Sequence, residues 1–387
     1  MSVYHLNGNT VQGAYNVEGT ALSYAYDIEG NEVLSGVTPD YNQYSNAYQK
    51  AILDARDEWK TQYRSDHDVI PLVVHTDQHG RFVTSNTATV ELFQYLGLAI
   101  NWSEVSAMIG LGDVDLAVEN YPQMNTVLNH ACARSKQINI WGNHDLWRNY
   151  TTVNDQFVVD FETTYPCFSN ETYGDESHAY NHKGIEYHID EAHNIKYVCI
   201  AGWEINKNLG GYSHYVIGSQ SLDDIIDMLE ADDGYDLIVL CHVRPWSIPK
   251  NYLMSAGGTN GADALYETSS EGDSASINVG ANLDAMFTAR NNHTSGTVID
   301  QYGVSHNYDF TNCTNKIICA FFGHWHQDMY GWSSSDMLQI AMDAYAYGTR
   351  PFYLINIDRT SETVTLWKIC NDAYYGSYTV PFNQQTN

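Results

Sequence analysis

From residue 69 onward, short apolar runs of strand length alternate with longer segments whose apolar residues recur at helical spacing. The apolar runs predict strands over residues 69–76, 107–111, 137–141, 196–201, 235–240 and 316–322. The helical spacing predicts helices over residues 85–98, 121–135 and 219–231. Three later runs are expected to form antiparallel and more peripheral strands, over residues 339–341, 352–358 and 363–370. This alternation predicts an α/β fold built of packed layers.

The first 38 residues follow a different pattern, which repeats every 11 residues. Units of the form Tyr-x-apolar-x-Gly begin at Tyr4, Tyr15 and Tyr26, and each alternates apolar and polar positions. Such units predict short strands joined by tight turns. Three of them hold too little core to stand alone, so residues 1–38 are expected to pack on the rest of the chain or on a partner. They are interpreted as an attachment or assembly module, or as a β-extension of the main domain.

A helix and a loop complete the predicted organisation. Residues 40–65 have helical spacing, with a stripe of Tyr and Trp that includes Trp59 and is expected to pack. This helix makes residues 39–68 a link between the repeat and a main domain over residues 69–387. Residues 254–282 are rich in Gly, Ser, Ala and Asn, which predicts a long surface loop, either a lid or an inert insertion.

Side chains of metal-binding type follow five of the predicted strands. The five segments are Asp77-x-His79, Gly112-Asp113, Gly142-Asn143-His144-Asp145, the lone His242 and Gly323-His324-x-His326. Open α/β sheets place their sites at the carboxyl ends of strands, so these segments are expected to meet. The glycines in them allow the backbone to turn tightly and approach the site closely.

The donors at these strand ends suit a pair of metal ions. They comprise three oxygen donors and four imidazoles, from Asp77, Asp113, Asn143, His79, His242, His324 and His326. This mixture fits Zn, Mn, Fe or Ni. A carboxylate shared between two ions places them roughly 3.5–4 Å apart, where they clamp a phosphate and generate hydroxide from water. The sequence therefore predicts two divalent metal ions and phosphoester hydrolysis.

In order and in kind, the five segments resemble the signature of the calcineurin-like metallophosphoesterase family, which is D-x-H, G-D, G-N-H-D/E, H and G-H-x-H. The resemblance covers residues 69–370 and says nothing about residues 1–65. It implies a four-layer α-β-β-α sandwich. Gly112-Asp113-Val114-Asp115 lacks a following Arg-Gly, which argues against the protein serine/threonine phosphatase branch.

The resemblance also implies roles for individual residues. The first metal would be held by Asp77, His79, Asp113 and His326. The second would be held by Asp113 as the bridge, with Asn143, His242 and His324. A metal-bridging hydroxide would attack phosphorus in line. His144 would contact the leaving group or a phosphate oxygen as general acid or electrostatic stabiliser, and Asp145 would orient it.

The remaining histidines and arginines receive smaller roles. His75 is expected to lie in the core. A loose group without tight ligand spacing is expected at the surface, comprising His178, His182, His188 and His193. Arg244 is a candidate for contact with a substrate phosphate, together with Asn143 and His144; otherwise it is structural or solvated.

Composition limits the partners. Hydrophobic residues make up 43% and charged residues 17% of the 387 residues, as in a globular chain. A net charge of −29 disfavours binding to duplex nucleic acid or to anionic membranes, although solubility is its simplest explanation. Cys199, Cys241 and Cys319 lie in apolar runs and are expected to be reduced and buried. No signal-peptide pattern and no run of 18 apolar residues is visible.

Two functions of different class remain open. The first is a metal-dependent phosphodiesterase or phosphatase. Acidic, Tyr-rich chains with short N-terminal repeats resemble phage tail or virion-associated enzymes, which would cut a bacterial surface polymer such as teichoic acid. A cytoplasmic phosphodiesterase or phosphatase acting on nucleotides is close behind. The second function is a virion structural or adhesion protein with a vestigial site, whose repeat binds other structural proteins or self-assembles.

Overall fold

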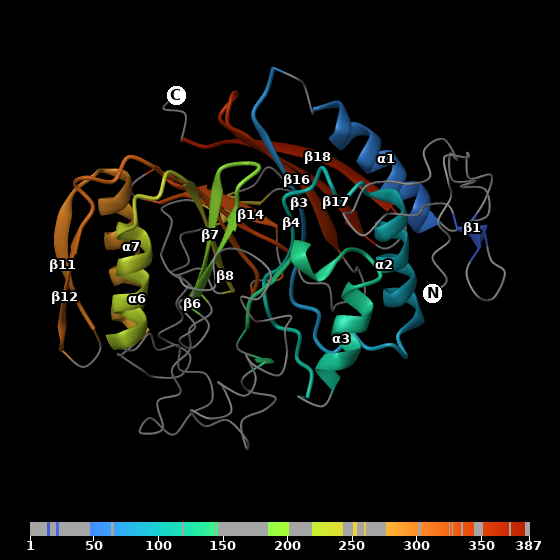
Figure 1. Ribbon diagram of the computed structural model, residues 1–387, viewed down its shortest axis with the longest axis horizontal. Coiled ribbons are helices and arrows are strands. Elements are labelled where there is room, and N and C mark those ends of the chain that lie inside the picture. The colour runs from blue at the N-terminus through green and yellow to red at the C-terminus, as the bar shows by residue number, and fades with distance from the viewer. Residues whose placement is uncertain are drawn as a thin grey trace, which may run out of the picture.

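Two large mixed sheets, with helices beside them, make up the fold (Figure 1). The computed structural model describes residues 14–15, 21–22, 47–62, 66–117, 120–142, 144–145, 185–200, 219–242, 251–253, 259–260, 276–300, 303–324, 326, 328–333, 336–343, 351–370 and 373–383. The predicted site residues Asn143 and Arg244 lie outside these ranges, as do His178, His182 and most of the predicted loop at 254–282.

The first sheet has six strands in the order β18-β17-β16-β3-β4-β5. These strands are β3 (Val69–His75), β4 (Ala107–Gly110), β5 (Gln137–Asn139), β16 (Phe352–Asp358), β17 (Thr363–Cys370) and β18 (Ala373–Pro381). The strands β3, β4 and β5 are parallel, so their carboxyl ends meet at one edge. Antiparallel β16 lies directly beside β3. The expected peripheral position of residues 352–358 and 363–370 is therefore wrong, because both strands lie inside the sheet, whereas their expected antiparallel pairing is confirmed.

The second sheet has eight strands in the order β10-β9-β14-β15-β13-β8-β7-β6. These strands are β6 (Ile185–Asp190), β7 (Ile195–Ile200), β8 (Asp236–Cys241), β9 (Asn251–Leu253), β10 (Thr259–Asn260), β13 (Ile317–Phe322), β14 (Met329–Trp332) and β15 (Leu338–Ala341). The strands β7, β8, β13 and β15 run parallel. Since β15 is a buried inner strand parallel to β13, the expected peripheral, antiparallel position of residues 339–341 is also wrong, and only its pairing with β14 is antiparallel.

The helices are α1 (Ala47–Thr61), α2 (Thr87–Ala99), α3 (Tyr121–Leu128), the short 3-10 helix η3 (Arg134–Lys136), α6 (Ser219–Glu230) and α7 (Ser276–Asn291). In Figure 1, α6 and α7 lie on one side of the two large sheets and α1, α2 and α3 on the other. The predicted helix over residues 121–135 is too long. The chain has to turn back into β5, and the side chain of Gln137 holds this turn by donating to Asn129 Oδ1 at 2.9 Å and Cys132 O at 3.0 Å.

Smaller elements lie outside the two sheets. In the N-terminal repeat, β1 (Ala14–Tyr15) pairs antiparallel with β2 (Ala21–Leu22); the rest of the repeat lies outside the described residues, and its role stays a prediction. A separate hairpin joins β11 (Ser295–Ile299) to β12 (Ser305–Asp309). Helix α7 begins inside the range 254–282, which was expected to be a loop.

One expectation about the cysteines is confirmed in the described residues. Cys199, Cys241 and Cys319 are buried and form no disulfide. Within the described ranges, no helix has the length and apolar character needed to cross a membrane.

Trp59 fixes α1 to the six-stranded sheet, so replacing it should destabilise the fold. Its side chain is buried, and its Nε1–H donates to Ile355 O at 3.1 Å, while Asn356 Nδ2 donates to Trp59 O at 3.1 Å. Trp59→Ala should lower the free energy of unfolding by about 3–5 kcal/mol, as measured by urea denaturation. Lys50→Ala, on the exposed face of the same helix, should change it by less than about 0.5 kcal/mol. Equal effects of the two substitutions would contradict this role.

Candidate metal centre

The ends of strands from both sheets meet at one place and are joined by hydrogen bonds. Within the six-stranded sheet, Asp77 N–H donates to Gly112 O at 2.9 Å. Within the eight-stranded sheet, Gly323 N–H donates to His242 O at 3.0 Å. Across the two sheets, His324 N–H donates to Asp77 Oδ2 at 2.9 Å. The segments that follow β3, β4, β8 and β13 are therefore held against one another, as parallel strand ends predict.

Several residues of these segments hold a left-handed backbone. Among the described residues, ten other than glycine have a positive φ, and six of these ten lie here: Asp77, His79, Asp113, Asp115, His324 and His326. Their φ angles lie between 41° and 66°. Each such conformation costs on the order of 1–3 kcal/mol, persists only where the surrounding structure holds it, and is typical of functional sites. The residues with a strained backbone are thus largely the same residues whose side chains can bind a metal ion.

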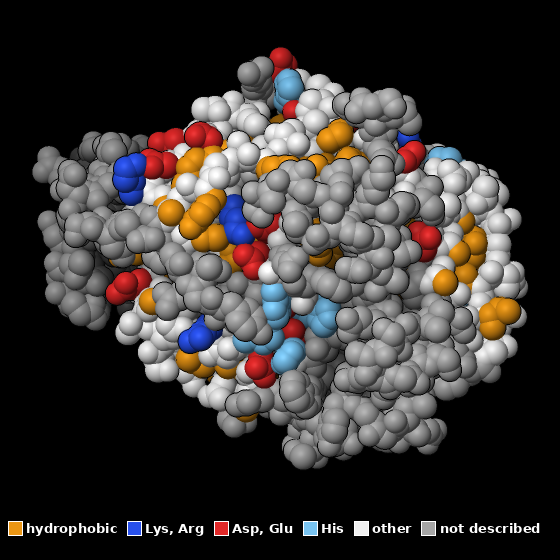
Figure 2. All heavy atoms as spheres, turned by 180° about the vertical axis from the view of Figure 1, so that it is seen from behind, with side chains coloured by type: hydrophobic (Ala, Val, Ile, Leu, Met, Phe, Trp, Pro, Cys, Tyr) orange, Lys and Arg blue, Asp and Glu red, His pale blue; other side chains and the backbone are white. Residues whose placement is uncertain are grey.

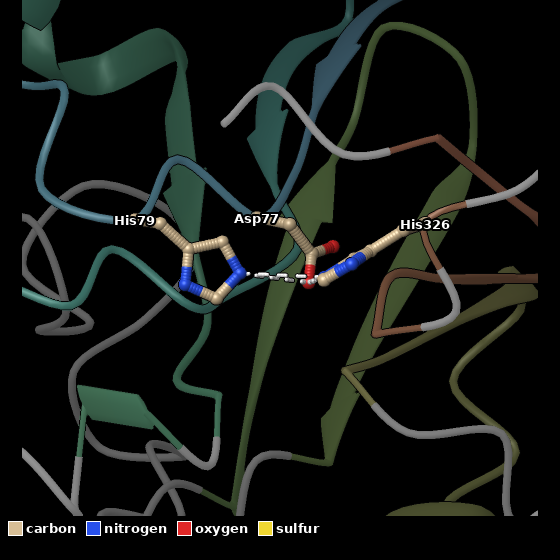
Figure 3. Close-up of side chains that lie close together, drawn as sticks. All are labelled: Asp77, His79 and His326. Atoms are coloured by element: carbon tan, nitrogen blue, oxygen red, sulfur yellow. Dashed lines mark hydrogen bonds and ion pairs between the residues drawn. The ribbon is translucent and has the colours of Figure 1, made fainter. Parts of the chain in front are cut away.

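Asp77, His79 and His326 form the first group of converging side chains (Figure 3). Asp77 Oδ1 lies 3.0 Å from His326 Nε2, and His79 Nε2 lies 3.3 Å from the same nitrogen. All three ligand atoms lie within 4.8 Å of one another. The hydroxyl of Thr76 donates to Asp77 Oδ2 at 2.6 Å and so orients the carboxylate. One metal ion fits among these atoms.

Asp113, His242 and His324 form a second group, again with ligand atoms within 4.8 Å of one another. His242 Nε2 lies 3.2 Å from Asp113 Oδ2. Its other ring nitrogen, Nδ1, donates to Leu111 O at 2.6 Å, which fixes the ring and directs Nε2 toward the carboxylates. The second group shares no residue with the first, yet His242 Nε2 is only 4.0 Å from Asp77 Oδ1.

His144 completes a third group with His79 and Asp113, so Asp113 belongs to two groups. Its Nε2 lies 4.0 Å from Asp113 Oδ2, and its backbone N–H donates to Asp113 Oδ1 at 2.8 Å. The neighbouring Asp145 accepts backbone N–H groups of Gly142 and Asp115, each at 2.8 Å. Burial, and then the charge of Asp113, raises the pKa of Asp145 to about 7. Asp145 thus supports the backbone of the site, while its predicted action on the His144 ring stays a prediction.

The site is closed on one side and open on the other. The side chains of Asp77 and His242 are 0% exposed and that of Asp113 is 1% exposed, whereas those of His144 and His326 are each 28% exposed. Figure 2 shows histidine side chains beside carboxylates on one face of the molecule. Buried carboxylates therefore lie on the closed side of the site, and partly exposed imidazoles lie on its open side.

Opposite charges face one another in the buried half of the site. Burial opposes protonation of His242, but Asp113 and Asp77 outweigh it and raise the pKa of His242 to about 9. Burial also opposes ionisation of Asp113, yet His242 and His144 lower the pKa of this carboxyl group. Burial, and then the charge of His242, lowers the pKa of His324 to about 4. An ionised Asp113 at neutral pH attracts cations into the site.

Gly323 is needed because the site leaves no room for a side chain. A Cβ at this position would lie 2.1 Å from Thr76 Oγ1 and 2.6 Å from Asp77 Oδ2. Gly323→Ala should therefore displace Asp77 and lower metal affinity by about 10- to 100-fold, as measured by titration of the metal-free protein. Gly234→Ala, where a Cβ meets no atom within 4 Å, should retain the affinity. Unchanged affinity in Gly323→Ala would show that Asp77 does not hold metal.

The structure brings together every predicted metal ligand that it describes, comprising Asp77, His79, Asp113, His242, His324 and His326. The seventh, Asn143, and the proposed phosphate contact Arg244 lie outside the described residues. His75 is in the core against Phe82 and Phe93, as predicted, and burial lowers its pKa to about 3.

Two expectations about side chains differ from the structure. His188 is 1% exposed, so its expected place at the surface is wrong. Asp115, which received no role, has Oδ2 3.8 Å from His79 Nδ1. The signal for Asp115 was its position two residues after Asp113, because both follow the same strand.

Comparison with known proteins finds one similar solved structure and no similar sequence. No model of a known protein family matches the chain, and no curated protein sequence matches it. Among solved structures, a dimetal phosphatase from Danio rerio is similar over 81% of this chain and 99% of that chain, with 10% sequence identity and a TM-score of 0.44. At this level of similarity, function has to be argued from the site itself.

Proposed function

We propose that this chain hydrolyses a phosphoester with two divalent metal ions. The observation that carries the proposal is the place of Asp113 at the meeting point of the strand ends, where its Oδ2 lies 3.2 Å from His242 Nε2 and 3.9 Å from His79 Nε2. A carboxylate shared in this way is what a dinuclear site requires. In this proposal the first ion is held by Asp77, His79, Asp113 and His326, and the second by Asp113, Asn143, His242 and His324.

The donor atoms are of the types that such ions bind, and hydrogen bonds hold them in position. Carboxylates together with imidazoles suit Mn, Zn, Fe or Ni. The hydrogen bond from His242 Nδ1 to Leu111 O presents Nε2 as the ligand atom, and the hydrogen bond from Thr76 to Asp77 orients a first carboxylate. Asp113 and Asp77 are buried, and a buried carboxylate is stabilised by a cation.

When bound, two such ions polarise a phosphate group and bring the pKa of bound water close to neutrality. The chain itself contributes position and protons. His144 lies on the open side of the site, beside Asp113, where its exposed imidazole reaches a substrate oxygen. It would donate a proton to the leaving group or stabilise charge on the phosphate. Buried Asp145 holds the backbone that carries His144 by accepting the Gly142 N–H.

The finer form of the proposal is a phosphodiesterase that acts on a cell-surface phosphopolymer such as teichoic acid, as a phage virion-associated enzyme. Its support is compositional: 30 tyrosines, a net charge of −29 and the N-terminal repeat. The repeat would attach the enzyme to other structural proteins or to itself. We also propose that the helices and the two sheets stack as a four-layer α-β-β-α sandwich.

The test of hydrolysis uses the purified full chain. Bound metal is quantified, and turnover of bis-p-nitrophenyl phosphate is compared with that of p-nitrophenyl phosphate in the presence of Mn²⁺. We expect about two ions at this centre, apart from any metal held elsewhere in the chain, and faster turnover of the diester. Chelation should remove these ions and abolish the turnover. Absence of bound metal together with absence of turnover on either ester would overturn the proposal. Faster turnover of the monoester would replace the diesterase by a phosphatase.

The substrate class is tested separately. Purified bacterial wall polymers and cyclic nucleotides are offered to the same preparation, and released phosphate-containing products are measured. Preference for the wall polymers supports the virion-associated function. Preference for the nucleotides would contradict it and favour a cytoplasmic phosphodiesterase.

A further inference from the structure

A second cluster of ligand-type side chains lies on β6 and β7, in the half of the eight-stranded sheet away from β14. It consists of Glu186, His188 and Cys199, whose ligand atoms all lie within 4.8 Å of one another. We propose that these three residues form a further metal site, separate from the two-metal centre, that binds Zn²⁺. The proposal does not depend on phosphoester hydrolysis.

The register of the two strands brings the three side chains together. Glu186 lies directly opposite Cys199 in the antiparallel pair β6–β7. His188 is two residues further along β6, and residues two apart in a strand point to the same face. His188 Nε2 lies 2.9 Å from Glu186 Oε1. Ligand atoms of a tetrahedral zinc ion are about 3.3–3.8 Å apart, given bonds of roughly 2.0–2.3 Å, so a small opening of this contact admits the ion.

Because this cluster is buried, a positive charge beside its acidic groups would stabilise it. Glu186 is 5% exposed, His188 1% and Cys199 0%. A buried carboxylate is costly unless it is paired, and among the described residues its ion-pair partner is His188, which is charged only when protonated. Cys199 is free and is not in a disulfide. Metal binding would displace the proton of the Cys199 thiol, and the resulting thiolate together with the carboxylate would carry two negative charges, which one divalent cation neutralises.

The donor set selects the type of metal. One sulfur, one imidazole nitrogen and one carboxylate oxygen suit Zn²⁺, whereas Mg²⁺ and Ca²⁺ prefer oxygen donors. Three protein ligands leave one tetrahedral position for a further ligand. Because β6 is the edge strand, a metal bridging β6 and β7 would fasten this edge of the sheet.

The cluster is near the two-metal centre but distinct from it. Cys199 is paired with Leu240 of β8, which lies two residues before His242. None of the three cluster residues belongs to the groups formed by the ends of β3, β4, β8 and β13. The chemistry also differs, because the proposed ligands of the two-metal centre include no thiolate.

This difference supplies the experiment. The metal-free full chain is titrated with Co²⁺, and the near-ultraviolet charge-transfer absorption from thiolate to Co²⁺ is recorded. We expect the band in the wild type, its loss in Cys199→Ser, and its retention in Cys319→Ser, which removes a buried thiol elsewhere in the sheet. Cys241→Ser, next to His242, should also retain the band. His242→Ala should lose phosphoester hydrolysis but keep the band, which separates the two sites.

Several results would overturn the proposal. Absence of the band in the Co²⁺-loaded wild type would leave only a buried His–Glu hydrogen bond. Retention of the band in folded Cys199→Ser, or its loss in Cys241→Ser, would assign the thiolate to another place. If Cys199→Ser fails to fold, X-ray absorption of the zinc-loaded wild type and of Cys241→Ser decides, with a sulfur neighbour expected at about 2.3 Å in both.

Discussion

Asp113→Asn should abolish phosphoester hydrolysis and release metal from both positions of the centre. The substitution keeps the size of the side chain but removes the charge that two groups of ligands share. His242 Nε2, 3.2 Å from Asp113 Oδ2, would then lose the carboxylate that faces it. Metal ions supply several kcal/mol of transition-state stabilisation, and each 1.36 kcal/mol is tenfold in rate. Turnover of bis-p-nitrophenyl phosphate should therefore fall by at least about 10³-fold.

Metal content and turnover have to be measured on the same folded preparation. Circular dichroism checks the fold, and elemental analysis counts the ions. Asp54→Asn removes an exposed carboxylate from α1 and should keep both metal and turnover. If Asp113→Asn retained two ions with normal turnover, Asp113 would not be the bridge, and the dinuclear arrangement would be wrong.

The ends of β3, β4, β8 and β13 were predictable from the sequence because each of these strands is a largely apolar run that is followed by polar residues. The runs that became β16 and β17 were predicted with their observed bounds, 352–358 and 363–370. The neighbours of a strand in the sheet were not predictable in the same way. The partner of β16 is β3, almost 300 residues earlier, and nothing local in either run specifies that pairing. Pairing follows from how the two apolar faces fit.

At the site, too, some features were predictable from the sequence and others were not. The types of the candidate ligands and their order along the chain are properties of the sequence, and the structure brings six of these candidates together at one site. The contacts between these candidate ligands and the residues that orient them depend on the tertiary structure and cannot be read from the sequence. The hydroxyl of Thr76 on Asp77 and the carbonyl of Leu111 under His242 are such contacts. The left-handed backbone at Asp113 was equally invisible, because local preference disfavours it.

Strand β6 was missed because its polar residues point inward. Glu186, His188 and Asp190 alternate with apolar residues, a pattern that normally places the polar residues in solvent. Here all three are buried. Asp190 is paired with the hydroxyl of Ser106, which directly precedes β4, and His188 with Glu186. The apolar residues that alternate with them are buried or half-buried as well, so β6 is covered on both faces and the alternation marks no solvent-exposed face.

His144→Ala should lower turnover by about 10²- to 10⁴-fold while leaving the metal content of the centre unchanged. The backbone N–H of His144 donates to Asp113 Oδ1 at 2.8 Å, and this bond survives in alanine. The imidazole itself is 28% exposed and lies on the open side of the site. A proton donor matters most for a poor leaving group. The loss should therefore be larger for an alkyl phosphodiester than for bis-p-nitrophenyl phosphate.

Comparison of the two esters distinguishes the two roles proposed for His144. A loss that grows with the basicity of the leaving group identifies a general acid, whereas an equal loss on both esters identifies electrostatic stabilisation of the phosphate. His130→Ala, at an exposed histidine after α3, should leave turnover unchanged on both. Loss of metal in His144→Ala would contradict both roles. The group that His144 forms with His79 and Asp113 would then be a true ligand set, and the leaving group would have to take its proton from elsewhere.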